Sequence, residues 1–202
     1  MLITLVVANQ KGGVGKTTTA LNLAASLSAA SRKVLLIDLD SQGNSTSGTG
    51  EEKNEASHSL IDILLNEGFP IEKAIKQTKY KFDLIPASVD LISAEIELGS
   101  LPNPTSLLKN KLSNMQASYD YVVIDCPPSL GMISVSALRA ASKVLIPLQC
   151  EYYSLEGLAS MSKTLREINE ATGENIEING ILRTMYDPRI RLSREVSKEL
   201  EE

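Results

Sequence analysis

Hydrophobic and polar positions follow two alternating periodicities along the chain. Short apolar runs, which are typical of strands, occur at residues 2–8, 33–38, 82–86, 121–125, 144–148 and 176–182. Between them, apolar residues recur at helical spacing, which predicts helices through Ala20, Leu23, Ala24 and Leu27 and at residues 60–65, 71–75, 89–98, 106–115, 154–171 and 192–200. This alternation predicts an α/β fold with a mostly parallel central sheet flanked by helices.

The predicted topology indicates where chemistry should lie. In a parallel sheet with right-handed crossovers, the carboxyl ends of the strands meet at one edge, and ligands bind there. We therefore expect ligand-binding residues in the segments that follow the strands. One of them, residues 41–59, is rich in Ser, Gly, Thr, Asn and Glu, and predicts a mobile loop.

The segment after the first strand is rich in glycine. Residues 9–18 read NQKGGVGKTT and stand between a strand and a helix, a context that predicts a phosphate-binding turn. Backbone N–H groups and the positive end of the helix dipole then face a polyphosphate. Gly12, Gly13 and Gly15 leave room for a close approach. Lys16 can reach the β- and γ-phosphates, and the Thr17 hydroxyl can bind Mg²⁺.

Aspartates follow two other predicted strands. Asp125 ends an apolar run, and Pro127 and Pro128 after it cannot continue a central strand. A lone carboxylate there is costly unless it meets a cation, so we expect Asp125 to hold Mg²⁺ directly or through water. The alternative is a strand-end carboxylate bonded to backbone amides. Asp38 and Asp40 follow a further strand and should converge on the same edge.

The glycine-rich segment departs from the ordinary P-loop spacing, because Gln10 stands where the first glycine belongs. Its string resembles the deviant Walker A motif of the ParA/MinD group of ATPases. The resemblance implies a three-layer P-loop NTPase with ATP and Mg²⁺ as cofactors, and a homodimer with ATP at its interface. ATP-binding residues are then Lys11, Gly12, Gly13, Val14, Gly15, Lys16, Thr17 and Thr18.

Catalytic roles also follow from this resemblance. It implies that Lys11 crosses the dimer interface to the partner's nucleotide, that Lys16 acts on the phosphates, and that Asp40 orients the attacking water. Asp38 then supports the outer shell of the metal or the loop. Ser41 stands where the family usually has proline, which we expect to alter the turnover rate without removing a catalytic group.

Further stretches, at residues 125–131, 149–158 and 184–189, resemble the chromosome-partitioning ParA/Soj branch. This branch implies an ATPase for chromosome or plasmid partitioning that binds DNA without sequence preference and is stimulated by a ParB-like centromere-binding protein. Met185 either packs on adenine or is an ordinary core methionine. A basic cluster either neutralises DNA phosphates or is a solvated helix face balanced by nearby glutamates; it comprises Arg189, Arg191 and Arg194.

Length, net charge and cysteine content bear on the number of domains, the extent of nucleic-acid binding and the cellular compartment. The 202 residues predict one domain, residues 1–202, which stops before the last strand and helix usual in the family and so reads as C-terminally truncated. The net charge of −5 argues against an extended nucleic-acid coat but permits a local basic patch. Cys126 and Cys150 read as buried structural thiols. We expect a cytoplasmic, nucleoid-associated protein without a membrane partner.

Three alternatives stay open on the sequence. A MinD-like membrane-cycling ATPase needs a C-terminal amphipathic helix, which the short, acid-rich residues 192–202 match badly. An iron–sulfur reductase needs interface cysteines, for which Cys126 is poorly placed. A nucleotide-binding scaffold without turnover is disfavoured by Lys16, Asp40 and Asp125.

Overall fold

A seven-stranded sheet organises the part of the chain that the computed structural model describes, residues 2–52, 60–116 and 118–201. Its strand order is β3–β4–β2–β5–β1–β6–β7, and all neighbours are parallel except β3 and β4. The strands are β1 (Ile3–Val7), β2 (Val34–Asp38), β3 (Lys76–Gln77), β4 (Asp83–Ile85), β5 (Tyr121–Asp125), β6 (Lys143–Gln149) and β7 (Glu177–Thr184). The predicted α/β fold with a mostly parallel sheet is confirmed.

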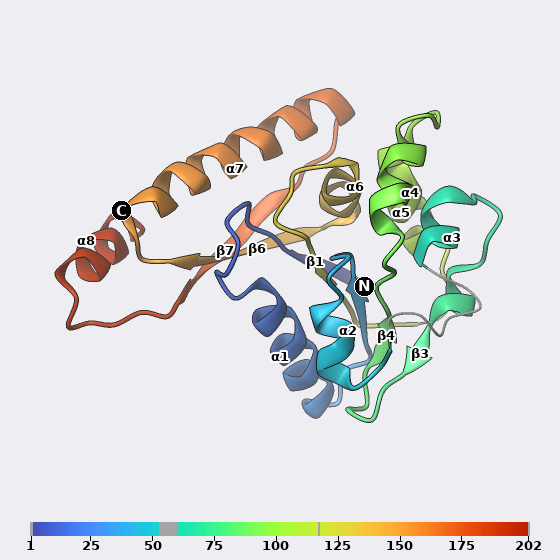
Figure 1. Cartoon of the computed structure of the whole chain (residues 1–202), viewed down its shortest axis with the longest axis horizontal. Helices are drawn as coiled ribbons and strands as arrows, with labels where there is room; N and C mark the ends of the chain where they lie inside the picture. The colour runs from blue at the N-terminus through green and yellow to red at the C-terminus, as the bar shows by residue number, and fades with distance from the viewer. Residues whose placement is uncertain (1, 53–59, 117, 202) are drawn as a thin grey trace.

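Helices cover both faces of this sheet (Figure 1). One face carries α1, with α2 beside it, and the other face carries the remaining helices up to α7. The helices are α1 (Lys16–Ala29), α2 (Asn44–Thr49), α3 (Leu60–Leu65), α4 (Leu91–Leu98), α5 (Leu107–Ser113), α6 (Met132–Ala140), α7 (Tyr152–Thr172) and α8 (Arg191–Glu199), with 3₁₀ turns at Ile71–Ala74 and Pro104–Ser106.

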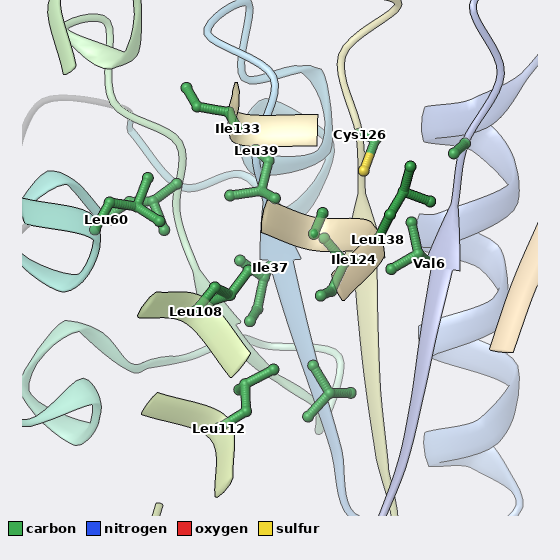
Figure 2. Close-up of a cluster of buried hydrophobic side chains, with 14 of the residues drawn as sticks. Val6, Ile37, Leu39, Leu60, Leu108, Leu112, Ile124, Cys126, Ile133 and Leu138 are labelled. Atoms are coloured by element: carbon green, nitrogen blue, oxygen red, sulfur yellow. The ribbon is translucent and has the colours of Figure 1, made fainter. Parts of the chain in front are cut away.

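Side chains alternate between the two faces of a strand. In the three central strands, β1, β2 and β5, the side chains on both faces are apolar, as expected for buried parallel strands. Val6, Ile37 and Ile124 stand side by side across β1, β2 and β5, and they pack on the side of α5 and α6 (Figure 2). Their neighbours in sequence face α1, which contributes the small buried residues Ala20 and Ala24. Burial on both faces makes this centre the rigid platform for the loops at its carboxyl edge.

The strand register brings the predicted site segments together. Val7, after which the glycine-rich loop starts, pairs with Asp125 of β5, and Asp125 in turn pairs with Asp38 of β2. The first loop and both carboxylates therefore begin at the same level of the sheet, as the parallel topology requires.

Residues 41–59 differ from the predicted mobile loop. Residues 44–49 form the short helix α2, and Ser45 and Thr46 in it are fully buried. Their hydroxyls supply hydrogen bonds to the buried carboxylates of Asp125 and Asp38, which is the physical reason for order in a polar stretch. Residues 53–59 of the predicted loop lie outside the described residues.

Ile124 tests how strongly the central platform supports the fold. This side chain is fully buried in β5, directly before Asp125. We expect Ile124→Ala to lower the free energy of unfolding by about 2–5 kcal/mol, because it leaves a cavity in a packed sheet. Urea unfolding followed by circular dichroism measures the change. Ile96→Ala, at a side chain that is 77% exposed, is the matched control and should stay within about 0.5 kcal/mol of the parent.

Candidate functional site

The glycine-rich loop has the backbone geometry of a phosphate-binding turn. Gly13 and Gly15 have φ angles of 73° and 88°, a left-handed conformation in which other side chains are strained. Helix α1 begins directly afterwards, so its free N–H groups open toward the loop. The Thr184 hydroxyl at the end of β7 donates to the Val14 carbonyl at 2.8 Å and ties the loop to the sheet.

Lys16 lies folded within this loop. The residue is 7% exposed, and its Nζ donates to the Lys11 carbonyl oxygen at 3.0 Å. Burial lowers the pKa of Lys16, and the charges of Asp125 and Asp40 oppose that shift. The ammonium group is therefore held where a polyphosphate in the loop would meet it.

Asp125 is fully buried at the end of β5. Its Oδ2 accepts a hydrogen bond of 2.8 Å from the Ser45 hydroxyl, whereas its buried Oδ1 has no hydrogen-bond partner among the residues that the structure describes. Burial, and after it the charge of Asp38, raises the pKa of Asp125 to about 7, although hydrogen bonds from Ser45 and Thr17 favour the charged form. An incompletely satisfied carboxylate this deep is costly and suits a bound cation.

Asp38 has a fuller set of partners. It accepts hydrogen bonds from the Thr46 amide at 2.8 Å, the Thr46 hydroxyl at 2.7 Å and the Asp40 amide at 3.2 Å. Burial still raises the pKa of Asp38 to about 6. The Thr46 hydroxyl also accepts from the Ala87 amide at 2.9 Å, so one hydroxyl joins β2, α2 and the segment after β4. These contacts fasten α2 to the edge of the sheet.

Asp40 faces an open cavity of about 470 Å³. It is 8% exposed, and its Oδ1 accepts a hydrogen bond from the Gln42 amide at 2.9 Å. The volume lies within the range of small-molecule sites. The lining residues are Gly12, Gly13, Gly15, Lys16, Thr17, Thr18, Asp40, Gln42, Asn44 and Pro128.

These residues fit a single Mg²⁺ ion that is completed by phosphate and water. The described residues contain no cluster of three or more His, Cys, Asp or Glu side chains that would hold a metal by themselves. A hard cation prefers oxygen ligands and usually keeps several waters. Thr17 lines the cavity and offers its hydroxyl oxygen. Asp125 does not line the cavity, but it interacts with the Thr17 hydroxyl at the end of β5 and has a further carboxylate oxygen without a partner among the described residues.

Lys11 does not line the cavity. Its side chain is 36% exposed, and its ammonium group forms an ion pair with the carboxylate of Glu151, directly before α7. Sequence reasoning assigned no role to Glu151. Its partner could not be found from spacing, because 140 positions separate the two residues.

Met185 is not the core methionine that the sequence left open. It is 65% exposed, has a φ angle of 50°, and its sulfur accepts a hydrogen bond from the Gln149 amide nitrogen at 3.0 Å. The core alternative fails because this side chain is largely exposed just after the edge strand β7. Met185 does not line the 470 Å³ cavity either.

The basic cluster lies before and within α8. Arg189 and Arg191 are 88% and 85% exposed, and they pair with Asp187 and Glu195, each at 2.7 Å. Arg194 is exposed on the same helix. The structure therefore places all three guanidinium groups at the surface, with neighbouring acids on two of them.

The two cysteines and the helix composition bear on the iron–sulfur and membrane alternatives. Cys126 and Cys150 are both buried, and burial raises the pKa of each thiol, which disfavours a cluster ligated at the surface. Among the described helices, none combines the length and hydrophobicity that crossing a bilayer requires.

A cavity of about 670 Å³ lies at the opposite edge of the sheet, near Leu2 and Tyr119. Its Arg139 is already bound to Glu174 and Thr105.

Comparison with known proteins agrees with this geometry. A family model described as an AAA domain matches residues 3–178. The chromosome partitioning protein ParA of Myxococcus xanthus is 44% identical over 97% of this chain and 69% of that protein. The sporulation initiation inhibitor protein Soj of Bacillus subtilis is 43% identical over 97% of this chain and 78% of its own length.

Solved structures show the same fold. A structure from Mycobacterium smegmatis, described as cobyrinic acid a,c-diamide synthase with a bound ATP analogue and magnesium, has a TM-score of 0.92. It is 36% identical and covers 100% of this chain and 82% of that chain. The fold and the loop at residues 11–18 define a P-loop nucleotide-binding protein. The chain belongs to the ParA/Soj family of P-loop ATPases.

The buried carboxylates predict an inverse pH dependence of stability. Because the pKa of Asp125 rises to about 7 and that of Asp38 to about 6, the folded state binds more protons than the unfolded state between about pH 4 and about pH 7. The free energy of unfolding of the ligand-free protein should therefore fall as the pH rises from about 4 to about 7.

Urea unfolding at about pH 5 and at about pH 7.5 measures this difference. Asp125→Asn cannot ionise, so it should show a clearly smaller loss between the two pH values. A loss as large in Asp125→Asn as in the parent protein would contradict the assignment of the effect to this carboxyl.

Proposed function

We propose that this protein is a Mg²⁺-dependent ATPase of chromosome or plasmid partitioning, which dimerises around ATP and binds DNA without sequence preference. A ParB-like centromere-binding protein stimulates it, and it works in the cytoplasm on the nucleoid. The observation that carries the ATPase proposal is the buried Asp125 oxygen without a partner, at the sheet edge where the loop of Lys16 and Thr17 begins.

Charge and position supply the catalysis in this proposal. The loop amides and Lys16 bind the β- and γ-phosphates, and Thr17 and Asp125 hold Mg²⁺, which neutralises charge on the phosphates when bound. Asp40, fixed by the Gln42 amide, orients the water that attacks the γ-phosphorus. The described site contains no strong base, which agrees with slow basal turnover.

The dimer part of the proposal concerns Lys11. In the single chain its ammonium group is bound to Glu151, and both side chains remain partly exposed, at 36% and 55%. An exposed ion pair contributes at most about 1 kcal/mol, so a triphosphate presented by a second copy can displace Glu151 from Lys11.

The curated relatives named above support partitioning over the amide synthesis named for the Mycobacterium smegmatis protein, since their identity is higher, 43–44% against 36%.

Substitution of Asp40 should separate the effect on ATP hydrolysis from the effect on ATP binding. We expect Asp40→Ala to retain ATP binding while hydrolysis falls roughly 100-fold, because the attacking water loses its orientation. Isothermal calorimetry with ATP and phosphate release, measured with and without DNA and a ParB-like protein, test this. Lys16→Ala serves as the contrasting variant and should lose ATP binding itself. Normal hydrolysis by Asp40→Ala would refute the role given to this carboxylate, and no hydrolysis by the parent under any condition would indicate a scaffold.

The exposed arginines predict a salt-dependent contact with DNA. Neutralising a phosphate releases counterions, so each lost contact lowers the slope of log K against log salt by about one. We expect the double variant Arg189→Ala/Arg191→Ala to bind duplex DNA more weakly and to lower this slope by about two. Fluorescence anisotropy with a labelled duplex measures it. Lys163→Ala, at an exposed residue of α7, is the control, and an unchanged slope in the double variant would exclude these arginines.

A further inference from the structure

The side chain of Asn9, two residues after β1 ends, has a partner for each end of its amide group. Asn9 is buried; its Nδ2 donates to the Pro147 carbonyl oxygen of β6 at 2.7 Å, and its Oδ1 accepts from the Lys11 backbone amide at 2.9 Å. A carbonyl can only accept and an N–H can only donate, so the two partners fix the orientation of the side-chain amide. The sequence patterns assign no role to this residue.

The bond to Pro147 replaces a main-chain bond of the sheet. Strands β1 and β6 are parallel neighbours (Figure 1), and the Ala8 amide donates to the Leu145 carbonyl at 3.1 Å. Bonds in a parallel ladder recur at every second residue, so the next one would join the Gln10 amide to the Pro147 carbonyl. Asn9 Nδ2 binds that carbonyl instead. The main chain can therefore leave the sheet at Gln10 while the carbonyl of the buried Pro147 keeps a donor.

The bond to the Lys11 amide fixes the start of the glycine-rich loop. An asparagine side chain that accepts from the backbone amide two residues later closes an Asx turn, which restricts the backbone between them. The carbonyl oxygen of the same Lys11 accepts a hydrogen bond from Lys16 Nζ at 3.0 Å. Asn9 is therefore connected to the ammonium group of Lys16 through a single residue.

Asn9 holds Lys11 by its backbone, whereas the side chain of Lys11 has a different partner. The ammonium group of Lys11 is bound to Glu151, in an ion pair that remains partly exposed. A hydrogen bond to the main chain persists when the side chain changes its partner. Lys11 can therefore exchange Glu151 for a triphosphate while the loop keeps its starting position.

We propose that Asn9 is a positioning residue of the nucleotide site. It holds the start of the glycine-rich loop, and through Lys11 the ammonium group of Lys16, in the arrangement that receives a polyphosphate. A loop that is fixed before the ligand arrives loses less conformational entropy on binding, so this role raises affinity rather than the rate of the chemical step. The inference deepens the proposed function and rests on it, because it takes MgATP as the ligand of the loop.

Asn9→Ala removes both hydrogen bonds and tests this role. Phosphate release gives kcat and KM for MgATP, and calorimetry gives the Kd. We expect KM and Kd to rise about tenfold, the effect of about one hydrogen bond, while kcat stays within about twofold of the parent value. Amide hydrogen exchange reports on the loop itself: the Lys11 amide should exchange at least about tenfold faster in this variant.

Two further variants separate positioning from general stability. Asn9→Ser keeps an oxygen that can accept from the Lys11 amide in a serine turn, so exchange at Lys11 should match the parent and KM should stay within about threefold of it. Asn169→Ala is the matched control, because Asn169 makes the same pair of bonds before β7 begins, to the Ile176 carbonyl at 3.1 Å and from the Ile176 amide at 2.9 Å. It should lower the unfolding temperature as Asn9→Ala does and leave KM and Kd unchanged.

Four results would overturn the proposal: parent values of KM and Kd in Asn9→Ala, an equal loss of affinity in Asn169→Ala, an Asn9→Ser variant that binds as weakly as Asn9→Ala, or unchanged exchange of the Lys11 amide. The proposed function fails in a different way. If the parent protein binds MgATP without releasing phosphate, and Asn9→Ala still weakens that binding, the ATPase is refuted and the positioning role of Asn9 stands.

Discussion

The site depends on one electrostatic constraint: carboxylates at the carboxyl edge of a buried sheet need positive charge or hydrogen-bond donors. Asp38 meets the constraint with Thr46 and the Asp40 amide. Asp125 meets it only in part, through Ser45 and Thr17, and keeps one oxygen without a partner. That remaining demand, at the sheet edge where a phosphate-binding loop begins, is what makes the edge a site for a cation with a polyphosphate rather than a structural network.

The same constraint explains the order of α2 and the shape of the cavity. Hydroxyls of α2 are drawn into the sheet edge by the two carboxylates, and the chain between β2 and α2 then carries Asp40 to the cavity wall. Pro128 closes another wall because the strand must end after Asp125. The loops after β2 and β5 also border a small pocket beside α4.

The sequence predicted every strand except the two-residue β3, together with the glycine-rich loop and the convergence of Asp38, Asp40 and Asp125, because periodicity and parallel topology determine them. It missed α2, since Ser, Thr and Gly lack apolar periodicity and are ordered here only by distant carboxylates. The ion pair of Lys11 with Glu151 and the bond from Thr184 to Val14 join residues more than 100 positions apart, so no local pattern contains them. The exposure of Met185 depends on which strand forms the sheet edge, which periodicity does not specify.

The pKa of Asp125, measured by carbon-13 NMR of its labelled carboxyl group, tests most directly whether this carboxylate binds a cation. In the ligand-free protein we expect a pKa raised to about 7 by burial. With Mg²⁺ and a non-hydrolysable ATP analogue bound, the pKa should fall below the ordinary value of about 3.9, because a cation then faces the free oxygen. If the Asp125 carboxyl titrates at the same pH in the ligand-free and the nucleotide-bound protein, its oxygen is not a ligand of the bound cation.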